Sequence, residues 1–204
     1  MTGHFIAFEG GEGSGKSTQA RRLAERLGGR AVLTFEPGHS SLGAEVRRLL
    51  LDASDLDITA RAEALLMAAD RAQHVVDVIR PALEAGKAVI TDRYAASSIA
   101  YQGHGRQLPP GQVAQLSDWA TDGLWPDLTV LLAVPPGVAE GRRARPKDRL
   151  ESAGRDFHER VHEGFLLQAM SDTDRWATVD GTRSEDEVAA VVWDIVSIRF
   201  PDLA

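Results

Sequence analysis

The residues best suited to chemistry form a glycine-rich run near the start of the chain. The run is Gly10-Gly11-Glu12-Gly13-Ser14-Gly15-Lys16-Ser17, which matches the phosphate-binding loop pattern G-x-x-x-x-G-K-[ST]. Its small residues let several backbone N–H groups point at one anion. The pattern predicts that Lys16 reaches the β- and γ-phosphates of a nucleotide and that the Ser17 hydroxyl ligates Mg²⁺.

An acidic and a basic residue directly follow a predicted strand at residues 87–91. Asp92 is suited to hold the hydration shell of Mg²⁺, and the planar guanidinium of Arg93 is suited to bind a second anion. A plain ion pair at the end of a strand is the alternative. The phosphate loop in the same chain favours the catalytic interpretation.

Residues 140–149 are rich in arginine. We expect a short lid, at about residues 142–150, that brings cations to a transferred phosphoryl group and excludes water from it. A solvated basic loop is the alternative. The candidates for the lid cations are Arg142, Arg143, Arg145 and Arg149.

The segment His158-Glu159-Arg160-Val161-His162 matches H-E-x-x-H, the pattern of zinc metalloprotease helices. No third ligand suggests itself, and we favour a helix that has a polar face and buries Phe157, Val161 and Phe165. The remaining histidines show no pattern of partners, and we interpret them as ordinary residues. They are His4, His39, His74 and His104.

These residues need elements that position them, and the chain alternates short apolar runs with amphipathic stretches. Strands are predicted at residues 5–8, 31–35, 87–91, 128–134 and 176–179, and helices at 41–51, about 59–85, 110–121 and 152–171, with one more after the phosphate loop and one at the end. Continuous apolar runs indicate strands covered on both faces, as in a parallel sheet. The alternation predicts an α/β fold that binds ligands at the carboxyl ends of its strands.

The composition narrows the class of protein. Lys and Arg number 23 against 30 Asp and Glu, a net charge of −7, which argues against a general nucleic-acid or anionic-membrane binder. The absence of cysteine excludes disulfides and thiolate metal sites. No apolar run approaches membrane-spanning length, and the start of the chain lacks a signal-peptide pattern. We expect a single cytoplasmic domain over residues 1–204.

Several motifs in order along nearly the whole chain resemble those of thymidylate kinases, of the nucleoside monophosphate kinase group. The motifs are Phe8-Glu9-Gly10 with the phosphate loop, Glu36-Pro37-Gly38, Ala68-Ala69-Asp70-Arg71-Ala72-Gln73-His74, Asp92-Arg93-Tyr94, Ser97-Ser98 with Tyr101-Gln102-Gly103, and Asp148-Arg149-Leu150-Glu151. The resemblance implies a P-loop three-layer fold, with a five-stranded parallel sheet and helices on both faces. It also implies the reaction ATP + dTMP ⇌ ADP + dTDP with Mg²⁺, and a homodimer packed through helices.

The resemblance also implies a role for each matching residue. Thr18 would join the loop from Gly10 to Ser17 in holding the ATP phosphates, and Asp92 would act with Ser17 at the metal. On the acceptor side, Arg93 would bind the phosphate, Arg71 and Ser98 the thymine edges, Tyr101 with Gln102 the sugar side, and Glu12 would lie near the 3′-hydroxyl. In the lid, Arg142 would stack on adenine, and Arg143 or Arg145 would act during transfer, because this phosphate loop has no arginine. Asp148 and Glu151 resemble acidic residues near the metal and the acceptor.

The chain departs from the family pattern on the acceptor side. Phe35 stands where bacterial members usually have arginine, His39-Ser40 replaces a usual Gly-Thr, Met67 replaces an aromatic residue that stacks on thymine, and Ala133 replaces an aspartate. The sequence leaves open whether these changes weaken activity or loosen base specificity. Another P-loop small-molecule kinase is the alternative function. A nucleotide-dependent switch ATPase or GTPase is a further one, although the chain has no Asn-Lys-x-Asp guanine reader.

Overall fold

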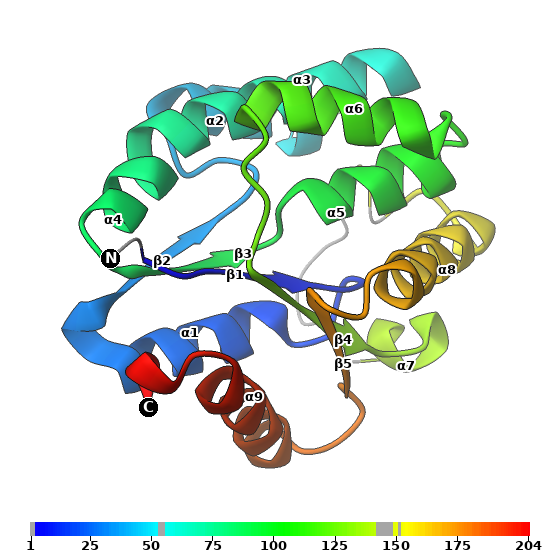
Figure 1. Ribbon diagram of the computed structural model, residues 1–204. Coiled ribbons are helices and arrows are strands. Elements are labelled where there is room, and N and C mark those ends of the chain that lie inside the picture. Colours follow the sequence, from blue (N-terminus) through cyan, green and yellow to red (C-terminus); the bar gives the residue numbers. More distant parts are fainter. Residues whose placement is uncertain (1–2, 53–55, 142–148, 151) are drawn as a thin grey trace.

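A parallel sheet organises the molecule (Figure 1). The computed structural model describes residues 3–52, 56–141, 149–150 and 152–204. Within them, five strands lie in the order β2-β3-β1-β4-β5, and every neighbouring pair is parallel. The strands are β1 (Phe5–Glu9), β2 (Ala31–Phe35), β3 (Ala88–Asp92), β4 (Leu128–Ala133) and β5 (Trp176–Asp180). The predicted α/β fold with its five strands is confirmed.

Helices cover both faces of this sheet (Figure 1). The α-helices are α1 (Lys16–Leu27), α2 (Ser41–Arg47), α3 (Ala60–His74), α4 (Arg80–Glu84), α5 (Ala95–Ser98), α6 (Pro110–Thr121), α7 (Pro136–Glu140), α8 (Arg155–Ser171) and α9 (Glu185–Arg199). Wider-turn segments continue three of them, namely η2 (Arg48–Asp52), η3 (Val75–Ile79) and η4 (Ile99–Gly105), and short 3₁₀ turns are η1 (Gly28–Arg30) and η5 (Pro201–Leu203). Figure 1 shows α1 and α9 below the sheet and the layer of α2, α3 and α6 above it.

The position of β1 within the sheet explains why its sequence is apolar up to Glu9. Ile6 and Phe8 pack into a core with α1 and α9, whereas Phe5 and Ala7 pack on the opposite face with η3 and α4. Successive side chains of a strand point to opposite faces. Because both faces are covered, every position of β1 is buried and apolar up to Glu9.

Two helical segments differ from the prediction. The helix α8 begins at Arg155 rather than at residue 152, because Gly154 before it has a φ of 88°, outside helical geometry. The sequence pattern predicts no helix at residues 95–105, where α5 and η4 lie. Glycine at 105 disfavours a helix locally, but a Cβ there would lie 2.6 Å from the Phe157 ring, so close packing against α8 requires it.

The carboxyl ends of β1, β2 and β3 lie at the same end of the sheet. The phosphate loop follows β1, Glu36 follows β2, and Arg93 follows β3, which ends at Asp92. In the described part of the chain, no helix combines the length and apolarity that crossing a bilayer requires.

Candidate active site

A hollow of about 470 Å³ lies at this end of the sheet. Residues of the phosphate loop and α1 line it together with residues from the ends of β2 and β3 and from α3, α5 and η4. Its volume lies in the range of small-molecule sites. We call it the catalytic hollow; its lining includes Glu12, Lys16, Glu36, Met67, Arg71, Asp92, Arg93, Ser98, Tyr101 and Gln102.

The phosphate loop leads from β1 directly into the first turn of α1. Gly10 has a φ of 139°, and a Cβ on it would lie 2.6 Å from the Leu132 carbonyl oxygen, so this turn requires glycine. The helix α1 begins at Lys16, which places the positive end of its dipole at the loop. Loop and helix together form an anion site of the kind that binds nucleotide phosphates.

Lys16 lies buried across its own loop. Its Nζ donates to the Gly11 carbonyl at 2.6 Å and to Ser14 Oγ at 3.3 Å. Burial, together with the charge of Arg93, lowers the pKa of Lys16 to about 8. The ammonium group therefore lies against the phosphate loop, where a negatively charged neighbour would stabilise its charge.

Ser17 and Asp92 meet at the start of α1, as the sequence predicts for a metal site. The Ser17 hydroxyl donates to Asp92 Oδ2. The other carboxylate oxygen, Oδ1, is buried and has no hydrogen-bond partner. Mg²⁺ in nucleotide sites uses one or two protein oxygens together with phosphates and water. This donor set therefore fits Mg²⁺, although the described residues contain no group of three or more His, Asp or Glu side chains that is arranged to hold a metal ion.

Arg93 is held by several elements at once. Nη1 donates to the Gly10 carbonyl at 3.1 Å and to Ser97 Oγ at 3.0 Å, and Nη2 bonds to Glu12 and to the Tyr101 hydroxyl. Although burial opposes its charge, Glu12 above all raises the pKa of Arg93 well above its usual value. Its φ of 71° is a left-handed conformation that costs a non-glycine residue about 1 kcal/mol or more. The site thus holds a permanent cation next to the phosphate loop.

Glu9, at the end of β1, holds the backbone segment that carries Arg93. Its Oε1 accepts from the N–H groups of Tyr94 (2.8 Å) and Ser97 (3.2 Å), and its Oε2 accepts from Ser97 Oγ at 2.6 Å. Burial raises the pKa of Glu9 to about 7. The sequence gives Glu9 no role beyond its place in a motif, yet it fixes the turn that carries Arg93.

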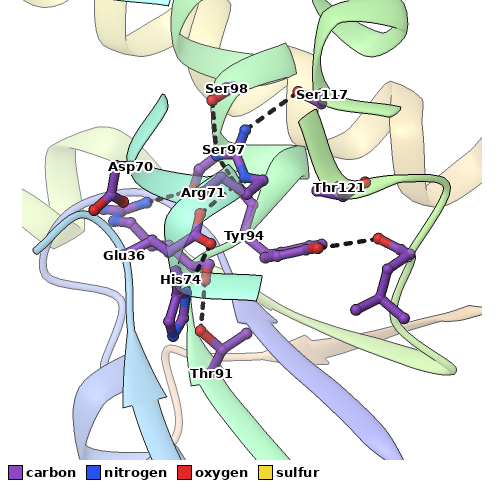
Figure 2. Close-up of polar contacts among 12 residues, drawn as sticks. Glu36, Asp70, Arg71, His74, Thr91, Tyr94, Ser97, Ser98, Ser117 and Thr121 are labelled. Carbon is purple, nitrogen blue, oxygen red and sulfur yellow. Dashed lines mark hydrogen bonds and ion pairs between the residues drawn. The ribbon is translucent and has the colours of Figure 1, made fainter. Parts of the chain in front are cut away.

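The structure brings Arg71 and Ser98 together, as the resemblance predicts. Figure 2 shows the buried Arg71 guanidinium among its partners. Nη2 donates to Ser98 Oγ at 2.9 Å and to the Tyr94 carbonyl at 3.3 Å, and Nη1 donates to Ser117 Oγ at 3.2 Å. With Nε bonded to Glu36 at 2.9 Å, at least one N–H of Nη1 is left for a bound molecule.

His74 has buried hydrogen-bond partners that the sequence pattern does not reveal. His74 is fully buried, its Nδ1 lies 2.9 Å from Glu36 Oε1, and its Nε2 lies 2.6 Å from Thr34 Oγ1. Among the other histidines, His4 pairs with Asp202 at 2.8 Å. These partners are distant in the sequence, so no local sequence pattern predicts them.

Gln102 lines the catalytic hollow, but its side-chain N–H donates to a residue that does not line the hollow. Its Nε2 donates to Glu63 at 2.9 Å, and Glu63 is fully buried. Glu63 also accepts from Arg106 and, at 2.6 Å, from Arg149. The sequence missed Glu63, a buried carboxylate that connects α3 to η4 and to the described end of the predicted lid.

The other predicted lid residues lie outside the described residues. These are Arg142, Arg143, Arg145 and Asp148, together with Glu151 after them. The alternative zinc pattern lies on α8, where Phe157, Val161 and Phe165 are buried as predicted. The glutamate of that pattern has another partner, because Glu159 pairs with Arg155. Arg160, at a variable position of the pattern, donates to the Gly105 carbonyl.

A phosphate loop at a helix start, a carboxylate bonded to the loop serine and an arginine held beside them define a P-loop kinase. Comparison with known families agrees, because the family model described as "Thymidylate kinase" matches residues 8–192. The chain belongs to the thymidylate kinase family.

Known relatives span almost the same length as this chain. The thymidylate kinase of Bifidobacterium longum (strain DJO10A) is 48% identical over 94% of this chain and 96% of its own. That of Cutibacterium acnes is 49% identical over 94% of this chain and 95% of its own. The crystal structure of thymidylate kinase from Ehrlichia chaffeensis superposes with a TM-score of 0.78 at 33% identity, covering 96% of this chain and 99% of that one.

Proposed function

We propose that the chain transfers the γ-phosphoryl group of ATP to dTMP, giving ADP and dTDP, with both nucleotides in the catalytic hollow. The observation that carries this proposal is the lining of that hollow. Lys16 and Ser17 of the phosphate loop, Arg93, and the pair Arg71 and Ser98 all face one cavity. The hollow therefore contains residues suited to the donor phosphates, residues suited to the polar edge of a base, and the cation Arg93.

On the donor side, the backbone from Gly10 to Ser17, with Thr18, would hold the ATP phosphates. Lys16 would leave the Gly11 carbonyl, which it contacts at 2.6 Å, for the β- and γ-phosphates. Ser17 and Asp92 would hold Mg²⁺, which neutralises phosphate charge when bound. On the proposed donor side, Arg142 would also stack on adenine, and Arg143 or Arg145 would act at the transferred phosphoryl group.

On the acceptor side, Arg93 would bind the dTMP phosphate and Arg71 with Ser98 the thymine edge. Arg93 now pairs with Glu12, so the incoming phosphate would exchange with that carboxylate. Glu12 would lie near the 3′-hydroxyl of the sugar, with Tyr101 and Gln102 on the sugar side. Met67 lines the hollow and would pack on the base through its polarizable sulfur.

No general base is needed for this reaction. The attacking group is a phosphate oxygen, which is anionic near neutral pH. Catalysis then consists of aligning two nucleotides and stabilising charge on the migrating group. The residues around the hollow supply this with backbone amides, one lysine and arginines.

The homodimer is a further part of the proposal. The helical layer of α3, η3 and α6 exposes Leu65, Val76 and Trp119, whose exposed fractions are 58%, 62% and 83%. Large apolar side chains on neighbouring helices indicate a protein interface. We expect Trp119→Glu to lower the mass of the particle in light scattering. Ile198→Glu, at an 80% exposed site on α9 across the sheet, is the matched control. Equal masses for both variants would contradict an interface on the α3 and α6 layer.

Residues 1–204 would form one kinase domain that works in the cytoplasm. The test of function is a coupled assay of ADP release with ATP, Mg²⁺ and a panel of acceptors. We expect turnover of dTMP well above that of dUMP, dCMP, AMP and GMP. Equal turnover of AMP or GMP would support another small-molecule kinase. ATP hydrolysis that is equally fast without any acceptor would support a switch ATPase.

A further inference from the structure

We propose that His74 is a positioning residue for base recognition: it holds the Glu36 carboxylate, and this carboxylate fixes the Arg71 guanidinium at the catalytic hollow. This inference rests on the proposed function, because it concerns how the thymine edge is chosen. His74 does not line the hollow, whereas Glu36, Arg71 and Ser98 do. It acts on the base only through these residues.

The contacts form a continuous buried relay. Thr34 Oγ1 lies 2.6 Å from His74 Nε2, His74 Nδ1 lies 2.9 Å from Glu36 Oε1, and Arg71 Nε lies 2.9 Å from Glu36 Oε2. Figure 2 shows Glu36 between Arg71 and His74. The exposed fraction of each of these residues is 5% or less. Buried polar groups without partners are costly, so this relay sets one arrangement.

The hydrogen-bond roles in the relay are fixed at one end by Arg71, which can only donate. A Glu36 carboxylate accepts from Arg71 through Oε2 and from the Nδ1–H of His74 through Oε1. The other ring nitrogen, Nε2, then accepts from the Thr34 hydroxyl, so a neutral ring satisfies every member. Both carboxylate oxygens are thereby engaged within the protein.

This arrangement leaves the free N–H of Arg71 Nη1 and the Ser98 hydroxyl for the edge of the base. Ser98 Oγ accepts from Arg71, so its hydroxyl proton is free to point at a ligand. Arg71 keeps at least one N–H of Nη1 for the same purpose. The 4-keto oxygen of thymine can accept from the free Arg71 N–H, and the thymine N3–H can donate to Ser98 Oγ. The 4-amino group of cytosine would instead meet the Arg71 donor with a donor. Sites of this kind discriminate because a wrong partner leaves buried polar groups unpaired.

Loss of the Nδ1–H of His74 would release an acceptor. Glu36 lines the hollow, so its freed Oε1 could accept a hydrogen bond from an amino group. It would also let the carboxylate turn and carry the Arg71 guanidinium with it. His74 thus sets the preference for a keto pyrimidine over an amino pyrimidine.

The test compares three substitutions by steady-state kinetics with dTMP and dCMP. His74→Leu fills the site without hydrogen bonds. His74→Asn places an amide N–H near the position of Nδ1, and His74→Gln extends an amide toward Thr34 instead. We expect His74→Leu and His74→Gln to lower the ratio of kcat/KM for dTMP over dCMP by about tenfold. The loss for dTMP falls on its KM, the KM for ATP stays unchanged, and His74→Asn retains the wild-type ratio.

Equal ratios in the Asn and Gln variants would overturn the inference, even if the Leu variant does not fold. A residue that only stabilises the protein would lower turnover of both acceptors alike and leave the ratio in place. The proposed function fails separately, at the wild type, if dTMP is not preferred over dCMP. A wild type that prefers dTMP, with variants that all keep its ratio, would contradict the role of His74 alone.

Discussion

The two sides of the catalytic hollow are built in different ways. The proposed donor side is a single stretch of chain, the loop from Gly10 to Ser17, and the groups that would bind phosphate there are largely backbone amides at the start of α1. The proposed acceptor side gathers residues from four separate segments of the chain: Glu36 after β2, Arg71 on α3, Arg93 after β3 and Ser98 on α5. Local geometry therefore provides the phosphate site, whereas long-range packing has to provide the acceptor site.

This difference also appears in the electrostatics. On the donor side, burial lowers the pKa of Lys16 to about 8, and a bound phosphate would stabilise its charge further. On the acceptor side, Arg71 and Arg93 already bond to carboxylates. We infer that the donor side is completed by its ligand, whereas much of the acceptor side is organised before any ligand binds.

Removing the donor-side cation should have the largest effect. Lys16→Ala takes a whole charge from the transferred phosphoryl group, and we expect turnover to fall by about 10³-fold or more. Steady-state kinetics at saturating ATP and dTMP measure this. Lys87→Ala, at an exposed lysine, is the control and should retain turnover. A Lys16 variant within tenfold of the wild type would contradict the proposed donor side.

Removing the acceptor-side cation should cost less, because other donors remain. Arg93→Ala leaves the dTMP phosphate without its guanidinium, and we expect about a 10²-fold loss in kcat/KM for dTMP, with a higher KM and slower transfer. The KM for ATP should change much less. Arg80→Ala, which removes an ion pair with Asp122 away from the hollow, is the matched control. Unchanged dTMP kinetics would refute the phosphate role of Arg93.

The buried Glu9, which holds the turn that carries Arg93, should make the free energy of unfolding depend on pH. Its pKa is raised to about 7 in the folded protein, so between pH 4.5 and 7 the folded state binds more protons than the unfolded state. Its contribution to stability is therefore greatest at low pH and is lost as the pH rises. From pH 5 to pH 7 we expect this loss to be about 2 kcal/mol, and Glu9→Gln should abolish it.

Urea unfolding of the wild type and the Glu9 variant at each pH measures this difference. Subtracting the two curves removes the contributions of other titrating groups, including Asp70, whose pKa burial raises to about 6. Glu84→Gln, at an exposed glutamate on α4, should follow the wild-type curve. Parallel curves for wild type and Glu9→Gln would show that Glu9 does not titrate in this range.

The same contrast explains what the sequence could predict. The phosphate loop, Lys16 and Ser17 follow from a local motif. The five strands follow from apolar runs, of which the three central ones, β1, β3 and β4, are buried on both faces. On the acceptor side, only the resemblance identified Arg71 and Ser98. His74 and Glu9 were missed because their partners lie far along the chain: His74 and Glu36, for example, are separated by 38 residues in the sequence. A polar residue in a buried network has the same local pattern as one on a helix surface.

The residues that depart from the family pattern give the smallest expected effect. Phe35 lines the catalytic hollow at 41% exposure, and its ring packs 5.2 Å from the His39 ring, which in turn lies 5.6 Å from the His74 ring. Phe35→Arg would place a cation at the acceptor side, so we expect the KM for dTMP to fall about two- to threefold at low salt and less at high salt. Leu33→Arg is closely matched, because Leu33 lies on the same face of β2, lines the hollow and is equally exposed. If both variants lower the KM equally, charge near the hollow matters and position 35 does not. If only Phe35→Arg lowers it, the strand end beside Glu36 faces the acceptor phosphate.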